Sequence, residues 1–126
     1  LYIADTLGEL GLFYSVATVA FLGGSLVPVG GHNPIEPAQL GAPIVHGPEI
    51  HNFAEILGAF DAADAAVKVL DSAGLAKAIA YLLQNEEARQ GLIDKARKIV
   101  AANEGALIRT MAEIDALLPP RSGGLA

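Results

Sequence analysis

The sequence predicts an α/β fold in which a parallel sheet is covered by helices on both faces. Short apolar runs that suit buried strands alternate with segments whose apolar residues recur at helical spacing. The run at residues 18–22 is unbroken and apolar, which is typical of a strand buried on both faces of a parallel sheet. A glycine-rich loop at residues 23–31 then connects this strand to a helix start, and in open α/β sheets such connections lie at the ligand-binding edge.

Composition indicates one globular domain. The chain has 126 residues, of which 52% are hydrophobic and 17% are charged, and these values suit a domain with its own core. The formal net charge is −6 and the eight lysines and arginines form no basic stripe, so no nucleic-acid partner is expected. The chain contains no cysteine, which excludes a disulfide framework and thiolate chemistry.

Residues 10–35 carry no charged side chain, and this stretch is long enough to span a membrane. Five glycines and Pro28 interrupt it, so a buried helix followed by a buried strand is the better interpretation. No signal peptide is recognised. The chain opens without methionine on residues that resemble the middle of a strand, which leads us to expect a fragment of a longer protein.

Four short strands are expected, each an apolar run bounded by glycine, proline or polar residues. Because helical segments separate successive strands, the strands are expected to run parallel. Four strands are few for such a sheet, which again suggests that further strands lie upstream. The expected strands comprise residues 1–4, 18–22, 43–46 and 65–70.

Helical segments are expected from apolar spacing and from residues that favour helix ends. Asp71 or Ser72 can cap the helix after the last strand, and Asn103 to Gly105 are expected to interrupt the C-terminal helical region. The domain is expected to occupy residues 1–118, followed by a polar tail at residues 119–126. The expected helices comprise about residues 9–17, 34–40, 53–60, 72–84, 87–102 and 106–118.

The glycine loop and the helix start after it form the candidate ligand site. Glycines lack a Cβ atom, so the backbone can turn tightly and approach a ligand closely. Asn33 can cap the helix, Pro34 suits its first position and Glu36 falls at the third. The unpaired N–H groups of a helix start suit an anion such as a phosphate. A capping box beside an ordinary turn is the alternative, since the spacing matches neither a P-loop nor GxGxxG.

Several short strings occur in a fixed order along the chain: DTLGEL at residues 5–10, GGSLV at 23–27, GGHNPIEP at 30–37, GP at 47–48 and NF at 52–53. In these strings the sequence resembles the C-terminal domain of the 3-deoxy-D-manno-octulosonic acid (Kdo) transferases, which glycosylate lipid A in bacteria. The resemblance covers nearly the whole chain, and GGHNPxEP is its most specific part.

The resemblance implies that the chain is part of the C-terminal domain of a GT-B glycosyltransferase. Such an enzyme has two Rossmann-like domains with the active site between them. The C-terminal domain would bind the donor CMP-Kdo. An N-terminal domain outside this sequence would bind the lipid A precursor and supply the general base, at the cytoplasmic face of the inner membrane. No catalytic residue is therefore expected in this chain, and the fragment alone is expected to be inactive. No cofactor and no metal ion are expected.

The resemblance also implies donor-binding residues. Glu36 is expected to accept hydrogen bonds from the ribose, and Gly24 and Ser25 to offer an N–H group and a hydroxyl to the donor phosphate. Asn33 is expected to act as cap and polar contact, while His32 is expected either to bind the phosphate or the Kdo carboxylate or to pack within the loop. The other residues expected to line the cleft are Thr6, Gly8, Glu9 and Gly31.

Asn52 is expected to anchor a loop, with Phe53 in the core. One alternative is a GT-B relative that uses a UDP-sugar, or a UDP-sugar epimerase of similar architecture. Its site would be of the same kind but would hold a different nucleobase. A non-catalytic nucleotide-binding or interaction domain is the alternative from a different class.

Overall fold

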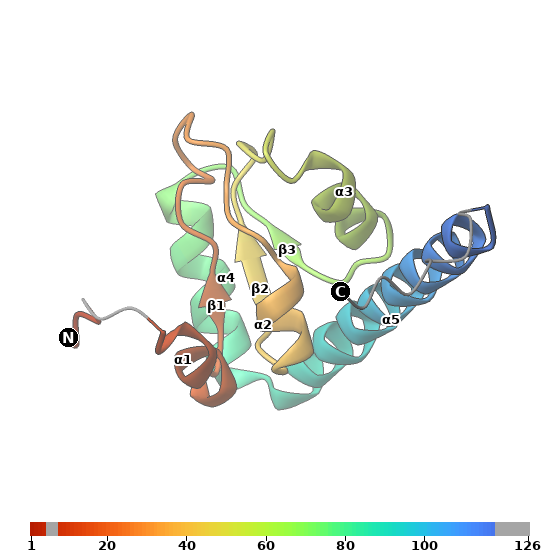
Figure 1. Ribbon diagram of the computed structural model, residues 1–126. Helices are drawn as coiled ribbons and strands as arrows, with labels where there is room; N and C mark the ends of the chain where they lie inside the picture. Colours follow the sequence, from red (N-terminus) through yellow and green to blue (C-terminus); the bar gives the residue numbers. More distant parts are fainter. Residues whose placement is uncertain (5–7, 118–126) are drawn as a thin grey trace.

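The computed structural model describes residues 1–4 and 8–117. Within this part of the chain the strands β1 (Ala20–Phe21), β2 (Ile44–His46) and β3 (Val67–Lys68) form one sheet in the order β1-β2-β3 (Figure 1). Both neighbouring pairs are parallel, with Ala20 opposite Ile44 and Val45 opposite Val67. The predicted parallel α/β fold is confirmed, with three strands in the described residues.

The prediction of a strand at residues 1–4 is wrong. Leu1, Tyr2 and Ile3 are largely exposed, and Figure 1 shows this segment away from the sheet. A short apolar run becomes a strand only where a neighbouring strand can take up its backbone hydrogen bonds. The ring of Tyr2 instead lies beside helix α1 (Leu10–Val16), where its centroid is 5.9 Å from that of Phe13.

Helices connect and cover the strands, and most of them were expected from the sequence. Asp71 caps the fourth helix, because its side chain accepts a hydrogen bond of 2.7 Å from the N–H of Gly74. The helices of the described residues are α1 (Leu10–Val16), α2 (Ile35–Gln39), α3 (Ala54–Ala62), α4 (Ser72–Gln84) and α5 (Glu86–Leu117).

The predicted interruption at residues 103–105 is wrong, because α5 is one continuous helix of 32 residues. A single glycine within a helix costs only about 1 kcal/mol relative to alanine. Gly105 is surrounded by alanine, leucine and glutamate, which favour the helix strongly enough to offset that cost. The predicted polar tail at residues 119–126 lies outside the described residues.

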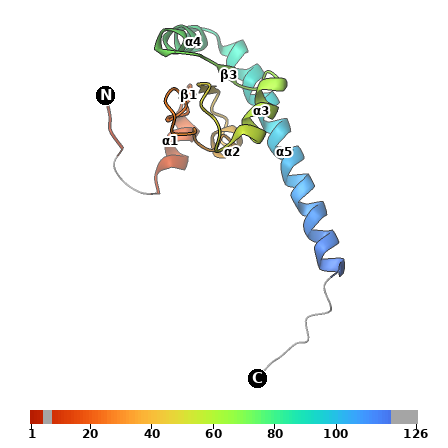
Figure 2. The same cartoon turned by 90° about the horizontal axis from the view of Figure 1, so that it is seen from above.

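The two faces of the sheet carry separate cores, because successive residues of a strand point to opposite faces. Ile44 packs in a core with residues of α2, α3 and α5, whereas Val45 packs in another with residues of α4. Figure 2 shows α4 on one side of the sheet and α2 on the other. The predicted covering of both faces by helices is therefore confirmed.

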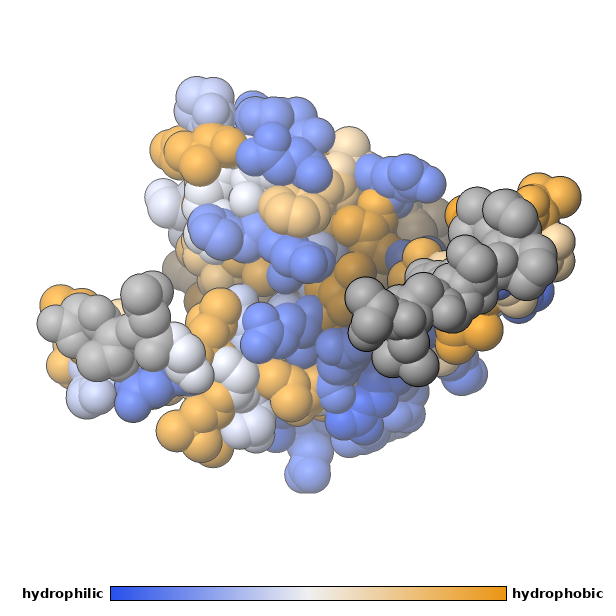
Figure 3. All heavy atoms as spheres, in the orientation of Figure 1, coloured by the Kyte–Doolittle hydropathy of each residue, from blue (hydrophilic) through white to orange (hydrophobic). Residues whose placement is uncertain are grey.

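The long helix α5 contributes to both cores. Ala88 and Leu92 pack on the core with α4, and Ala96 and Val100 belong to the core with α2 and α3. Beyond these residues α5 extends away from the sheet (Figure 2), and apolar side chains are exposed on its projecting end (Figure 3). In the described part of the chain, no helix has both the length and the apolar character needed to cross a bilayer.

Candidate functional site

The glycine loop, residues 23–31, folds back on itself where β1 ends. The N–H groups of Gly30 and Gly31 both donate to the carbonyl oxygen of Gly24, over 3.2 and 3.1 Å. The φ angles of Gly24, Gly30 and Gly31 are +69°, +106° and +79°. Glycine adopts such angles without steric cost, so the tight turn expected from the sequence is formed.

A second loop, residues 47–53, follows β2 and packs on the glycine loop. The backbone N–H of Asn52 donates to the carbonyl of Gly30 over 3.2 Å, and its side-chain amide donates to the carbonyl of Val29 over 3.1 Å. A Cβ atom at Gly30 would overlap the Asn52 amide and lie 2.6 Å from Nε2 of His51. Asn52 therefore anchors the loop, as predicted, and Phe53 packs against the core.

Ser25 is fully buried between the ends of β1 and β2. Its hydroxyl donates to the carbonyl of Leu22 over 2.5 Å and accepts from the N–H of Gly47 over 2.8 Å. Its carbonyl oxygen accepts from the N–H of Glu49 over 2.9 Å. In this structure the hydroxyl thus holds two loops together. Its contact with a phosphate stays a prediction.

His32 and Asn33 lie at the end of the glycine loop and are exposed. Nδ1 of His32 lies 2.7 Å from the carbonyl oxygen of Gly23, and a carbonyl can only accept, so Nδ1 carries a proton. Donation to an anion through Nε2 then requires the imidazolium form. Oδ1 of Asn33 accepts from the N–H of Ile35 over 3.0 Å, so Asn33 satisfies the first N–H group of α2, although Pro34 occupies the N-cap position predicted for Asn33.

Glu36 lies in the first turn of α2, exposed, and faces α1. Its Oε1 lies 3.4 Å from the position that a Cβ atom at Gly11 would take. Burial, and after it the negative charge of Glu36, raise the pKa of Tyr14 on α1 above its usual value. The Glu36 carboxylate accepts no hydrogen bond from the part of the chain that the structure describes. The second half of a capping box is therefore not formed there.

The other predicted site residues lie before α1. Thr6 lies outside the described residues. Gly8 is exposed and has a φ of +91°, and Glu9 occupies the N-cap position of α1 without a capping hydrogen bond from its side chain. The structure thus joins the glycine loop to the second loop, while Glu36 lies at the contact between α1 and α2.

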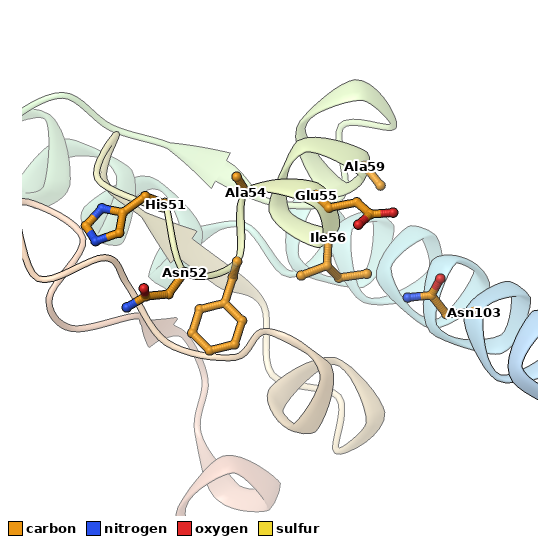
Figure 4. A pocket seen from close by; sticks show the side chains of 8 residues that line it. His51, Asn52, Ala54, Glu55, Ile56, Ala59 and Asn103 are labelled. Atoms are coloured by element: carbon orange, nitrogen blue, oxygen red, sulfur yellow. The ribbon is translucent and has the colours of Figure 1, made fainter.

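A cavity of about 530 Å³ lies beside the second loop (Figure 4). This volume falls within the range of small-molecule sites. It adjoins the glycine loop, because His51 and Asn52 line it and also pack at Gly30. Glu55 of α3 and Asn103 of α5 were not predicted to share a site, since no local spacing connects two positions so far apart in the chain.

No described residues form a group of three histidine, aspartate or glutamate side chains placed to hold a metal ion. Fold and site together define an α/β domain with a glycine-rich loop at the end of a strand of a parallel sheet, a class of domain whose ligands bind outside the carboxyl ends of the strands. No protein-family model matches the sequence.

Known proteins nevertheless match it closely. The chain is 36% identical to the 3-deoxy-D-manno-octulosonic acid transferase of Haemophilus influenzae over 110 residues, which are 86% of this chain and 26% of that protein. It is 37% identical over 109 residues to the transferase of the same description from Bordetella pertussis, again 86% of this chain and 26% of that protein.

A solved structure has the same fold. The crystal structure of the C-terminal CMP-Kdo binding domain of WaaA from Acinetobacter baumannii matches with a TM-score of 0.75 at 38% identity, over 79% of this chain and 52% of that one. The chain belongs to the Kdo transferase family, and the resemblance noted in its sequence is confirmed. It spans about a quarter of the length of the curated relatives it matches.

Proposed function

We propose that this chain is the donor-binding part of a glycosyltransferase that moves Kdo from CMP-Kdo to a lipid A precursor. The observation that carries the proposal is the glycine loop, fixed by the second loop at the end of β1 in a fold shared with a CMP-Kdo binding domain. The donor-binding domain would comprise residues 1–118. The acceptor site and the general base would belong to another part of the enzyme, which would work at the cytoplasmic face of the inner membrane.

The chemistry assigned to this chain is binding and charge stabilisation. In the transfer, an acceptor hydroxyl attacks the anomeric carbon of Kdo with inversion, a general base takes its proton, and CMP leaves with the electrons of the broken C–O bond. The backbone N–H of Gly24 can approach the departing phosphate because this residue has no side chain. Gly31 would shape the turn of the loop, since its N–H donates to the carbonyl oxygen of Gly24. His32 and Asn33 are exposed at the end of the same loop and would contact the phosphate or the Kdo carboxylate.

Glu36 is assigned to the ribose. Its carboxylate is exposed and has no hydrogen-bond donor among the described residues, so both oxygens are available to hydroxyl groups. Ser25 stabilises the site, because its hydroxyl joins the backbone at the ends of β1 and β2. Gly8 and Glu9, which precede α1, would complete the edge of the cleft together with Thr6.

The proposal is tested by titrating the ¹⁵N-labelled chain with CMP, and in parallel with UMP, while amide resonances are followed by NMR. The method detects dissociation constants near 1 mM, which correspond to about 4 kcal/mol of binding free energy. We expect saturable shifts at Gly24, Gly31 and Glu36 with CMP, and weaker binding of UMP. Tighter binding of UMP would favour a UDP-sugar enzyme. Saturable binding of neither nucleotide would contradict the proposal and favour an interaction domain.

A further inference from the structure

His46, the last residue of β2, is a buried histidine that the proposed chemistry does not use. Both of its ring nitrogens are engaged. Nδ1 lies 2.7 Å from the carbonyl oxygen of Gly47, and Nε2 lies 2.8 Å from Oδ1 of Asp61 on α3. Nζ of Lys68 on β3 lies 4.0 Å from the other carboxylate oxygen of Asp61. One imidazole therefore connects the end of β2 to α3.

The partners of the ring fix its orientation. The Gly47 carbonyl can only accept, so Nδ1 is the donor in that hydrogen bond. Nε2 then shares a proton with Oδ1 of Asp61, which is donated either by an imidazolium to a carboxylate or by a carboxyl group to a neutral ring. In both cases the ring is held at its two ends and cannot turn without breaking a hydrogen bond.

Gly47 carries this constraint to the glycine loop. Its carbonyl is held by His46, and the N–H of the same residue donates to the hydroxyl of Ser25 over 2.8 Å. The hydroxyl of Ser25 in turn donates to the carbonyl of Leu22, directly before the glycine loop. A series of hydrogen bonds, joined through the backbone of Gly47, thus runs from Asp61 on α3 to Leu22, directly before the glycine loop.

We propose that His46 and Asp61 are positioning residues that hold the glycine loop in its ligand-binding conformation. The ring is fully buried, so it acts through Gly47 and Ser25 and not by touching a ligand. Even a fully buried charged pair can often be replaced by apolar side chains without loss of stability, so stability alone gives no reason for His46 and Asp61. Their specific contribution is orientation, because the hydrogen bond from the ring fixes the direction of the Gly47 carbonyl group. The ligand-binding part of this inference rests on the proposed function.

Two variants separate the two ends of the ring. In His46→Gln the amide nitrogen can take the place of Nε2 and keep the contact with Asp61, while the donor to Gly47 is lost. In His46→Asn the amide nitrogen can take the place of Nδ1 and keep the donor to Gly47. Amide hydrogen exchange of the ligand-free chain, followed by NMR, reports on the N–H groups of Gly47 and Glu49, which donate to Ser25.

We expect His46→Gln to accelerate exchange at Gly47 and Glu49 by about tenfold, the effect of one lost buried hydrogen bond. His46→Asn is expected to stay closer to the unmodified chain at these amides. The dissociation constant for CMP is expected to rise about tenfold in His46→Gln, because the loop must then be ordered on binding. Lys68→Gln is the matched control, since Lys68 is half exposed and its Nζ lies 4.0 Å from Oδ2 of Asp61, which is not the oxygen that contacts His46.

Equal acceleration at Gly47 and at the core amide of Leu82 would overturn the proposal, because His46 would then be only a core residue. Unchanged exchange at Gly47 would overturn it as well. If His46→Gln does not fold, Asp61→Ala frees the Nε2 end of the ring by changing a side chain that is 26% exposed. A local acceleration at Gly47 and Glu49 is then expected that resembles that of His46→Asn and is smaller than that of His46→Gln, because the donor to Gly47 is kept. The exchange readout needs no ligand. A chain that shows the local acceleration but never binds CMP would therefore refute the proposed function and leave the positioning role supported.

Discussion

Gly47 packs directly against the peptide group of Ser25, although 22 positions separate them in the sequence. The N–H of Gly47 donates to the Ser25 hydroxyl, and a Cβ atom at Gly47 would lie 2.5 Å from the Ser25 carbonyl carbon. The backbones that follow β1 and β2 therefore meet without space for a side chain. The relative placement of the glycine loop and the second loop depends on this contact.

Gly47→Ala is accordingly expected to destabilise the chain by about 1–3 kcal/mol, the usual cost of inserting a methyl group where no space exists. Urea unfolding followed by circular dichroism gives the change in the free energy of unfolding. Gly58→Ala is the control, because a Cβ atom at Gly58 in α3 meets nothing within 4 Å. The control is expected to be neutral or to stabilise by up to about 1 kcal/mol. Equal stability of the two variants would contradict the close packing at Ser25.

Within the glycine loop, Gly30→Ala and Gly23→Ala form a matched pair. Gly30 has a φ of +106° and its Cβ atom would overlap Asn52, whereas a Cβ atom at Gly23 meets nothing within 4 Å. Backbone strain of this kind costs about 1–3 kcal/mol. We therefore expect Gly30→Ala to lower the midpoint of urea unfolding and to weaken CMP binding, while Gly23→Ala keeps the unfolding midpoint. A Gly30→Ala variant as stable as Gly23→Ala would show that the second loop is not tightly packed there.

Glu36→Gln in the intact transferase tests whether the Glu36 carboxylate binds the ribose of the donor. Each hydrogen bond to a charged acceptor is worth about 1.5–3 kcal/mol, so the Michaelis constant for CMP-Kdo is expected to rise by about tenfold to a few hundredfold. The melting temperature is expected to change little, because the carboxylate accepts no hydrogen bond from the described residues. Glu113→Gln, on the exposed part of α5, is the control. A lowered melting temperature with an unchanged Michaelis constant would make Glu36 a structural residue.

The raised pKa of Tyr14 predicts how stability depends on pH. The phenol loses its proton at a higher pH in the folded chain than in the unfolded chain, where its pKa is about 10. The folded state thus keeps the proton on Tyr14 up to a higher pH. This contribution to stability is complete below the unfolded pKa and is lost as the pH rises through the folded pKa. Tyr14→Phe is expected to reduce the fall in stability above the unfolded pKa.

The cause of that shift can be checked separately by following the Tyr14 ring resonances through an alkaline titration. Glu36→Gln is expected to lower the pKa of Tyr14 only part of the way to its usual value, because burial is the larger cause and the charge of Glu36 the smaller. An unchanged titration in Glu36→Gln would show that the carboxylate does not lie near the phenol.

Local chemistry was sufficient to predict most of the helices and the direction of the strands. The N-cap at Asp71 was predicted because a cap and the apolar spacing after it belong to one short segment. Residues 1–4 and the break at Gly105 were predicted wrongly. Whether an apolar run pairs, or a glycine ends a helix, depends on contacts and on neighbouring propensities that a local signal does not contain.

The same distinction holds for the candidate site. The glycine loop and the hydrogen-bonding role of Asn33 at the start of α2 were recognisable from their sequence. The hydroxyl of Ser25 was not recognisable as already bonded, because its partner Gly47 lies in the loop after the next strand. His46 gave no signal for the same reason, since Asp61 reaches it from α3 and follows no motif spacing.

The helix α5 also affects how the chain unfolds. Leu92 packs on one side of the sheet and Ala96 on the other, one turn further along the same helix. Neither side can open while the other stays closed unless α5 breaks between these two residues. Heat or denaturant is therefore expected to melt both sides in a single cooperative transition, and the slowest-exchanging amides of α4 and of the residues around Val100 to report the same free energy of opening.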